Sequence, residues 1–399
     1  MKFKQTIKDP GIDLYDFDAL LTDDERAWRK KARAFADDEV IPHIAPYWER
    51  GEFPEHIFKK MANLGACGGS LQGYGCPGLS NVAVGVIAME LARADGSLNT
   101  AFGVTSGLAM ASIHFCGSEE QKQHWLPQMA RMEKIGAFGL TEPFVGSDAS
   151  HITTTARKDG DGAAAGYVLT GAKRWIGNAN SADVVIIWAQ DDQTGQVSGF
   201  LVEKGTPGFA ATPILGKLAL RALVNCDIVL ENCFVPMANK LANCNSFRDV
   251  ARVLRATRLG VAWEAIGHAV AAYELALAYS KKRMQFGRAI ASFQLIQDKL
   301  VRMLAEVETI KLMGWRLSKL ADEGKMTEGQ ASLAKVHCCR RAREVVALGR
   351  DLMGGNGILI ENHMARHFAD MEAVYTYEGT NEINTLVVGR EITGIQAFA

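Results

Sequence analysis

Apolar residues in the first third of the chain recur at helical spacing. Two capping-box patterns, Thr22–Glu25 and Ser118–Gln121, mark the starts of predicted helices. We expect these helices to end just before Pro42 and near Pro127, because proline disfavours helical geometry in the residue before it. A further helix is predicted over residues 82–93.

The middle of the chain changes to short runs rich in β-branched residues, separated by glycine, aspartate and proline. This pattern predicts a small antiparallel sheet or barrel. The glycine-rich residues 160–166 neither follow a clear strand nor open a helix, so they indicate a hairpin loop and not a phosphate-binding loop. The predicted strands are Tyr167–Thr170, Asp183–Trp188, Gly199–Val202 and Cys226–Leu230.

The last third returns to long amphipathic stretches that are poor in proline. Helices are predicted over residues 251–282, 292–323 and 327–352. The order of helices, sheet and long helices indicates an α+β protein that is mostly α. We place the domains at residues 1–137 (N-terminal, helical), 138–246 (central, β) and 247–399 (C-terminal, helical).

Charge and hydropathy exclude several classes of protein. The chain has 44 Lys and Arg against 45 Asp and Glu, which argues against a basic footprint for nucleic acid. The longest apolar stretch, residues 259–279, contains Glu264, His268 and Glu274, so we expect a buried helix and no membrane span. The eight cysteines have neither zinc-ligand nor disulfide-framework spacing, which favours reduced thiols in a cytoplasmic protein without a metal.

Several glycine-punctuated segments carry candidate chemistry. Glu378 stands beside glycine in Tyr-Glu-Gly-Thr, and Met353-Gly-Gly-Asn-Gly is a turn where backbone can approach a cofactor closely. Taken alone, the first is more often a solvated carboxylate and the second a helix cap. The segments 138–148, 173–177 and 283–294 add hydroxyls, a tryptophan and an arginine that suit a flavin and its phosphates.

Together these motifs resemble the acyl-CoA dehydrogenase family over nearly the whole chain. The run Glu-Ala-Val-x-Thr-Tyr-Glu-Gly-Thr, residues 73–76 and the closing residues 389–398 resemble the glutaryl-CoA dehydrogenase branch, with plant short-chain acyl-CoA oxidases nearby. The resemblance implies an N-terminal helical domain, a central antiparallel β domain and a C-terminal four-helix bundle, in a homotetramer. It also implies FAD as cofactor and an acyl-CoA or acyl-carrier thioester as substrate.

The resemblance assigns roles to individual residues. Glu378 would remove the α proton of the thioester, and a hydride would pass from the β carbon to the flavin. The fallback base is Glu264 on the long helix. The implied cofactor-binding residues are Phe138, Leu140, Thr141, Ser147, Trp175, Ile176, Arg283, Phe286, Gln294, Met353, Gly354, Gly355, Gly357, Thr380 and Glu382, with Arg283 and Gln294 acting across a subunit boundary. The implied substrate-binding residues are Asn99, Thr100, Ser147, Arg258 and Gly379.

The chain departs from the family pattern at two places. Asn99 stands where glutaryl-CoA dehydrogenases carry the arginine that pairs with the distal carboxylate, and Ala92 replaces its acidic partner. An uncharged amide does not neutralise a buried carboxylate, so we expect a short-chain or branched neutral acyl group. Gly177 stands where the family usually has threonine near the flavin.

Three hypotheses for the activity remain open from the sequence. The first is a dehydrogenase that passes electrons to an electron-transfer flavoprotein. The second is an oxidase that uses O₂, or a specialised enzyme acting on a carrier-protein thioester. The third is a catalytically silent flavin-binding protein, against which the presence of Glu378 argues.

Overall fold

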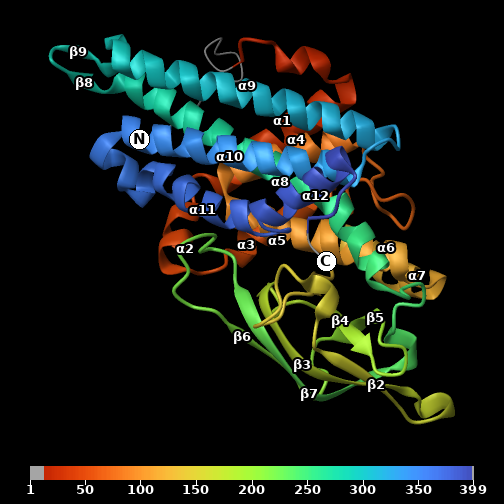
Figure 1. The fold of residues 1–399 in the computed structure, drawn as a ribbon. Coiled ribbons are helices and arrows are strands. Elements are labelled where there is room, and N and C mark those ends of the chain that lie inside the picture. Colours follow the sequence, from red (N-terminus) through yellow and green to blue (C-terminus); the bar gives the residue numbers. More distant parts are fainter. Residues whose placement is uncertain (1–12, 398–399) are drawn as a thin grey trace.

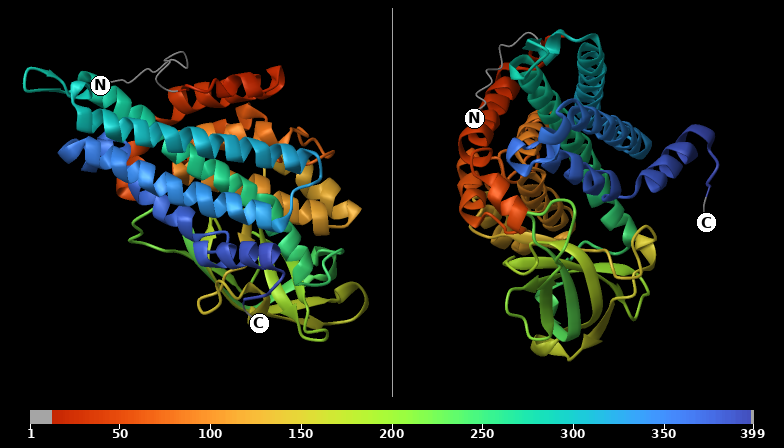
Figure 2. Two further views of the ribbon diagram at one scale, coloured as in Figure 1. Left: turned by 45° about the horizontal axis from the view of Figure 1, so that its top comes forward. Right: turned by 90° about the vertical axis from the view of Figure 1, so that its left-hand side faces the viewer.

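Helices from the two ends of the chain lie together, and the β strands form a separate layer at one side of them (Figure 1). The computed structural model describes residues 13–397. Two further views show the same division, one with the long helices seen from the side and one looking toward their ends (Figure 2).

The N-terminal region is helical, and its helices begin where the capping boxes predict. The Thr22 hydroxyl accepts from the backbone N–H of Glu25 at 3.2 Å, and the Glu25 carboxylate accepts from the N–H of Thr22 at 2.8 Å. Ser118 and Gln121 form the second box. The helices are α1 (Asp23–Phe35), α2 (Ile44–Arg50), α3 (Glu55–Lys60), α4 (Asn81–Ala94), α5 (Gly96–Gly103), α6 (Met110–Cys116) and α7 (Glu119–Ala130).

The predicted end of α7 near Pro127 is wrong, because the helix continues through this proline to Ala130. A proline inside a helix removes one hydrogen bond and typically costs about 3 kcal/mol. Trp125 and Met129 are buried in the core of the N-terminal region on either side of it. Burial of these large side chains offsets that cost and holds the last turn helical.

Seven strands form the sheet of the middle region. Their order is β1-β4-β2-β3-β7-β6, and β5 pairs with β4. The predicted strands fall within β3, β4, β5 and β7, and β2 and β3 form the hairpin predicted around residues 160–166. The bounds are β1 (Gly136–Gly139), β2 (Thr155–Asp159), β3 (Gly166–Gly177), β4 (Val184–Asp191), β5 (Val197–Glu203), β6 (Phe209–Pro213) and β7 (Asn225–Pro236).

Most strand pairs are antiparallel, as predicted, but β4 pairs in parallel with both β1 and β2. Local sequence patterns do not encode which distant strand becomes the neighbour, so these two pairings were not anticipated. The end of β1 and the residues that follow it line the site described below.

The C-terminal region contains three long helices and two shorter ones. The first long helix begins four residues before its predicted start, because Ser246 and Asp249 form a capping box. A two-stranded hairpin, β8 (Met284–Gln285) and β9 (Arg288–Ala289), projects between the first two (Figure 1). The helices are α8 (Phe247–Lys282), α9 (Gln294–Asp322), α10 (Glu328–Leu352), α11 (Met364–Thr376) and α12 (Asn381–Thr393).

Helix α8 lies at the centre of the helical layer. Its residues Trp263 and Ile266 share one apolar core with Val86 and Met89 of α4 and with side chains from α9, α10 and α11. Packing of α4 against α8 joins the N-terminal and C-terminal regions into one layer. Helix α8 therefore contacts helices of both the N-terminal and the C-terminal regions.

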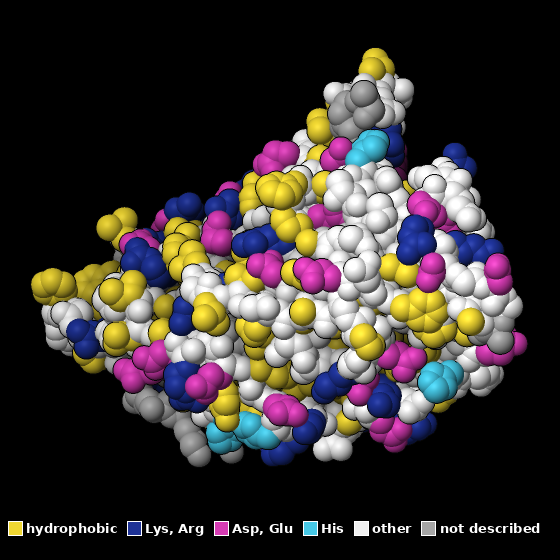
Figure 3. All heavy atoms as spheres, turned by 90° about the horizontal axis from the view of Figure 1, so that it is seen from below, with side chains coloured by type: hydrophobic (Ala, Val, Ile, Leu, Met, Phe, Trp, Pro, Cys, Tyr) yellow, Lys and Arg dark blue, Asp and Glu magenta, His cyan; other side chains and the backbone are white. Residues whose placement is uncertain are grey.

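The surface carries no large patch of one charge on the face shown in Figure 3, where acidic and basic side chains are interspersed. All eight cysteines are free, and seven of them are buried. Within residues 13–397, none of the helices combines the length and apolarity needed to cross a bilayer.

Candidate active site

A cavity of about 880 Å³ lies where the three regions meet. Its walls come from α4 and α5, from the end of β1 with the loop after it, from the end of β3, and from α8 with the loop between α11 and α12. The lining is mostly apolar with a few polar groups, which is typical of a small-molecule site.

Glu378 enters this cavity from the loop between α11 and α12. Its backbone has a φ of +56°, and Gly379 follows with a φ of +82°. Left-handed geometry is uncommon for a glutamate, so the surrounding structure must hold it. Lys335 donates to the carbonyl oxygen of Gly379 at 2.5 Å, and the Asn384 amide donates to the same oxygen at 2.7 Å.

The Glu378 carboxylate accepts a hydrogen bond from the hydroxyl of Thr257 on α8 at 3.3 Å. Burial raises its pKa, while Arg258, Lys335 and the Thr257 hydroxyl act in the opposite direction. A carboxylate with a raised pKa is a stronger base, which suits removal of a proton from carbon. The geometry thus gives Glu378 the properties of a general base.

Glu264, the fallback base, lines the same cavity. It lies seven residues after Thr257 on α8, which is two helical turns and about 10 Å along the axis. Its carboxylate accepts from the Thr100 hydroxyl at 2.9 Å and from the Tyr377 hydroxyl at 2.5 Å. Burial raises its pKa to about 7.

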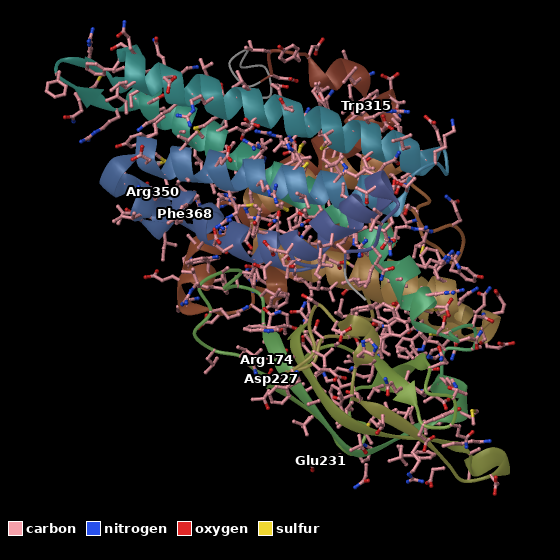
Figure 4. The ribbon with its side chains drawn as sticks, in the orientation of Figure 1. Arg174, Asp227, Glu231, Trp315, Arg350 and Phe368 are labelled. Atoms are coloured by element: carbon pink, nitrogen blue, oxygen red, sulfur yellow. The ribbon has the colours of Figure 1, made fainter. Side chains whose placement is uncertain are left out.

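One part of the cavity wall contains six of the residues that the resemblance assigns to the cofactor. Trp175 has a φ of +66° and interrupts the pairing of β3 with β7, which turns its indole out so that 51% of it is exposed. Arg174 covers that indole at 5.0 Å and pairs with Asp227 of β7 at 3.0 Å (Figure 4). The lining residues of this wall are Phe138, Leu140, Thr141, Ser147, Trp175 and Ile176.

A buried ion pair holds the loop that carries Thr141 and Ser147. The carboxylate of Glu142 accepts from Lys173 at 2.8 Å and from the backbone N–H and hydroxyl groups of Thr153 and Thr154, at 2.6–2.9 Å. Although burial alone would raise it, these contacts lower the pKa of Glu142 to about 2. These contacts fix the loop beside the cavity, and we call this group of residues the clamp.

The predicted substrate-binding residues also line the cavity. Asn99 is buried and Thr100 is partly buried on α5, and Gly379 follows Glu378. Arg258 donates to Glu328 at 3.1 Å, while its buried Nε atom has no partner in the described structure. An unpaired buried N–H facing a cavity fits a ligand acceptor at that place.

Nine of the predicted cofactor-binding residues lie outside the cavity lining. Most are at the hairpin end of the helical layer, where Phe286 at the tip of the β8–β9 hairpin is 92% exposed. The others begin α12, where the Thr380 hydroxyl caps the helix by accepting from Ile383. These nine are Arg283, Phe286, Gln294, Met353, Gly354, Gly355, Gly357, Thr380 and Glu382.

Sequence reasoning missed four residues that shape the site. Thr257 was detectable, because it shares a face of α8 with Glu264 at a spacing of two turns. Tyr377 was part of the Glu378 motif but received no role. Lys335 and Asn384 had no local signal, because their roles depend on a loop that packs against them from elsewhere in the chain.

The residues present fit a flavin. The cavity has room for a fused aromatic ring beside an acyl chain, and the exposed Trp175 and Glu378 both line it. Thr141 and Ser147 add hydroxyls to the same lining. These residues would hold the ring, and Thr257 with Glu378 would face the substrate.

Comparisons with known proteins agree with this geometry. Family models match for the acyl-CoA dehydrogenase N-terminal domain over residues 22–133, the middle domain over 137–233 and the C-terminal domain over 247–393. The chain is 34% identical to the probable acyl-CoA dehydrogenase YngJ of Bacillus subtilis, over 93% of this chain and 98% of that one.

Two solved structures extend the similarity to the fold. A glutaryl-CoA dehydrogenase from Mycobacterium smegmatis in complex with FADH2 is 38% identical, with a TM-score of 0.94 over 98% of this chain and 99% of that one. Butyryl-CoA dehydrogenase from Megasphaera elsdenii is 31% identical, with a TM-score of 0.89 over 93% and 98%. The chain therefore belongs to the acyl-CoA dehydrogenase family and is an FAD-dependent oxidoreductase.

Proposed function

We propose that the protein oxidises the Cα–Cβ bond of a short-chain or branched acyl-CoA to give the trans-2-enoyl-CoA, with Glu378 as the base. The observation that supports this proposal most is the Glu378 carboxylate, which faces a largely apolar cavity with a raised pKa and a hydroxyl partner. Family membership supports acyl-CoA as the substrate class.

Different residues of the chain have different roles in the proposed reaction. The Glu378 carboxylate takes the α proton while the Thr257 hydroxyl holds it in place. The backbone N–H of Glu378 makes no hydrogen bond with any described residue, so it is available to donate to the thioester oxygen as enolate charge develops. FAD, when bound, accepts the hydride from the β carbon. The apolar walls exclude water from the proton transfer.

The test is anaerobic bleaching of the bound flavin by a panel of acyl-CoAs. We expect neutral short or branched chains to bleach the wild-type flavin, and Glu378→Gln to retain FAD without bleaching. If no acyl thioester reduces the flavin of the folded holoenzyme, the proposal is wrong and the silent flavin-binding hypothesis replaces it.

The proposed substrate differs from that of the glutaryl-CoA dehydrogenase to which the chain is similar. Arg258 is the only arginine or lysine among the described residues that line the cavity, and it is already paired with Glu328. Asn99 is buried and uncharged. A distal carboxylate on the substrate would therefore remain unpaired, which disfavours glutaryl-CoA.

For the electron acceptor we propose an electron-transfer flavoprotein, with O₂ as the alternative. Both acceptors are compatible with the cavity walls, so a direct assay decides between them. Steady turnover under air without added acceptor, with stoichiometric hydrogen peroxide, would establish an oxidase. Turnover only with the flavoprotein would establish a dehydrogenase.

We further propose that the chain forms a homotetramer in which a neighbouring subunit completes each cofactor site. Large apolar side chains are exposed at the hairpin end of the helical layer, including Phe286, Leu295 (79%) and Ile358 (63%). Phe368 is 41% exposed near Arg350 on this part of the layer (Figure 4). An exposed apolar cluster of this size is typical of an interface. The predicted cofactor residues outside the cavity lie here and at the start of α12, which extends to one side (Figure 2).

Phe286→Ser tests this assembly, with Leu215→Ser as a matched control. Leu215 is 86% exposed on the loop after β6, far from the hairpin along the chain. We expect Phe286→Ser to lower the mass measured by light scattering and to release FAD, while Leu215→Ser leaves both unchanged. A wild-type monomer with fully bound FAD would contradict the proposal.

A further inference from the structure

One end of the cavity carries a buried carboxylate whose contacts the oxidation does not require. Glu264 is 4% exposed, and its hydrogen-bond partners are all neutral: the hydroxyls of Thr100 and Tyr377 and the side-chain amide of Asn99. It makes no ion pair with any residue in the described part of the chain. A buried carboxylate is normally paired with a cation or hydrogen-bonded at every lone pair, so this arrangement needs an explanation.

Simple structural support does not explain the charge. An ionised carboxylate offers about four lone-pair sites, and these three neutral donors occupy only part of them. A glutamine would accept from the same donors without the cost of burying a charge. Glu264 lines the cavity, so a ligand there can use the acceptor capacity that remains.

The position of Glu264 relates it to the substrate. Glu378 is held by Thr257, and Glu264 lies two turns further along α8, about 10 Å away along the helix axis. With Glu378 at the reacting carbons, Glu264 lies where the far end of an acyl chain of several carbons would reach. Asn99 and Thr100 lie at the same end.

The charge around this end selects the chemistry of the chain terminus. Glu264 lies here beside the neutral Asn99 and Thr100, and Arg258, the only arginine or lysine among the described residues that line the cavity, is paired with Glu328. The Glu264 carboxylate would repel an anionic terminus, and an apolar terminus would leave part of its acceptor capacity unused. A terminus that donates a hydrogen bond satisfies both requirements.

We infer that the acyl chain of the natural substrate ends in a hydrogen-bond donor, a hydroxyl or an ammonium group, which Glu264 accepts. This inference rests on the proposed function, since it assumes that Glu378 acts at the α carbon. The raised pKa of Glu264 agrees with it, because burial outweighs the hydrogen bonds that this carboxylate accepts from Tyr377, Thr100 and Asn99. Glu264 is thus a residue that determines specificity.

The experiment compares acyl-CoAs that differ only at the terminal carbon. Unsubstituted, ω-hydroxy, ω-amino and ω-carboxy chains of about four to eight carbons span the distance between the two carboxylates. With the wild-type holoenzyme, the best donor-terminated chain should exceed its unsubstituted counterpart in kcat/KM by about ten- to a hundredfold. The ω-carboxy chain should be the poorest at every length. Comparison of the ω-hydroxy and ω-amino chains identifies which donor is used.

Variants at two cavity carboxylates locate the effect. Glu264→Gln should reduce the preference for the donor terminus by about tenfold, and Glu264→Leu should reverse it in favour of the unsubstituted chain. Asp148→Asn is the matched control, because Asp148 is an exposed carboxylate that also lines the cavity. It should leave the ratio between the two chains unchanged.

The outcomes separate this inference from the proposed function. If acyl-CoAs bleach the flavin but the wild-type enzyme treats donor-terminated and unsubstituted chains alike, the inference is wrong and the proposed function stands. If no thioester bleaches the flavin, the proposed function itself fails. The wild-type panel decides the question even where a Glu264 variant does not fold.

Discussion

Glu142 and Glu264 are both buried carboxylates near the cavity, yet their surroundings are opposite. The Glu142 carboxylate accepts from Lys173 and from two threonines, each of which donates its backbone N–H and its hydroxyl, and its pKa falls to about 2. Glu264 accepts from two hydroxyls and the Asn99 side chain but has no cation as a partner, and burial raises its pKa to about 7. The first is complete in the protein alone and acts as a clamp. The second is incomplete and faces a ligand space, which marks it as a place for recognition.

The prediction with the largest expected effect concerns which of two cavity carboxylates, Glu378 or Glu264, is the base. Glu378→Gln should lower the rate of flavin reduction by about a thousandfold or more, because the amide accepts no proton while the fold and FAD remain. Glu361→Gln, at an exposed carboxylate, is the control. The rate is measured by anaerobic stopped-flow. A Glu378→Gln enzyme that still bleaches at the wild-type rate would make Glu264 the base and end its role in recognition.

The second test breaks the clamp. Lys173→Met leaves the buried charge of Glu142 without its cation and should destabilise the protein by about 3–5 kcal/mol, with loss of FAD. The double variant with Glu142→Gln should recover most of this stability, since the amide still accepts from the threonines. Urea midpoints and flavin content measure both effects. A Lys173→Met protein as stable as wild type would show that the pair is not a clamp.

The third test uses pH, because the two carboxylates act with opposite sign. The native state holds the Glu264 proton between pH 4.5 and about 7, so this residue lowers stability as pH rises through that window. The negative charge of Asp95 also raises the pKa of Glu264 and so adds to this loss of stability. Between pH 4.5 and about 7, the free energy of unfolding of Glu264→Gln should rise by up to about 3 kcal/mol relative to that of the wild type. Glu142 instead contributes stability above pH 4.5 that is lost as pH falls toward about 2.

These pH effects are measured as the difference in urea midpoint between wild type and each single variant over a pH series. Glu264→Gln and Glu142→Gln should give slopes of opposite sign in their respective windows. If the urea-midpoint difference varied with pH in the same direction for both variants, the two carboxylates would not differ in the sign of their pKa shifts.

The smallest expected effect concerns glutaryl-CoA. Its kcat/KM should be about a hundredfold below that of a neutral chain of equal length, because no free cation meets its carboxylate. Asn99→Arg alone should recover little, since Glu264 would take up the new guanidinium charge. Asn99→Arg with Glu264→Gln should recover more. Equal turnover of both substrates by the unmodified enzyme would show that the acidic end of the cavity does not select the chain.

Sequence patterns predicted the order of helices, sheet and helices because each follows from local periodicity and capping, as at Thr22 and Ser118. They failed at Pro127, where packing overrides the local cost, and at the parallel pairs of β4, which depend on distant strands. Motif resemblance gave a list of site residues, but contacts such as Lys335 to Gly379 required the folded chain. The placement of nine cofactor residues outside the cavity is invisible in a sequence, since it depends on where the helices end in space.

Tyr377 and Glu378 are consecutive residues whose side chains contact α8 two turns apart, one at Glu264 and the other at Thr257. One loop therefore connects the proposed base to Glu264, which we infer to bind the far end of the acyl chain. A mutation that displaces the Tyr377 hydroxyl from Glu264 is then expected to shift the neighbouring Glu378. A change in the preferred length of the acyl chain is then expected to require compensating pairs of substitutions, because substrate selectivity and reaction rate both depend on this loop.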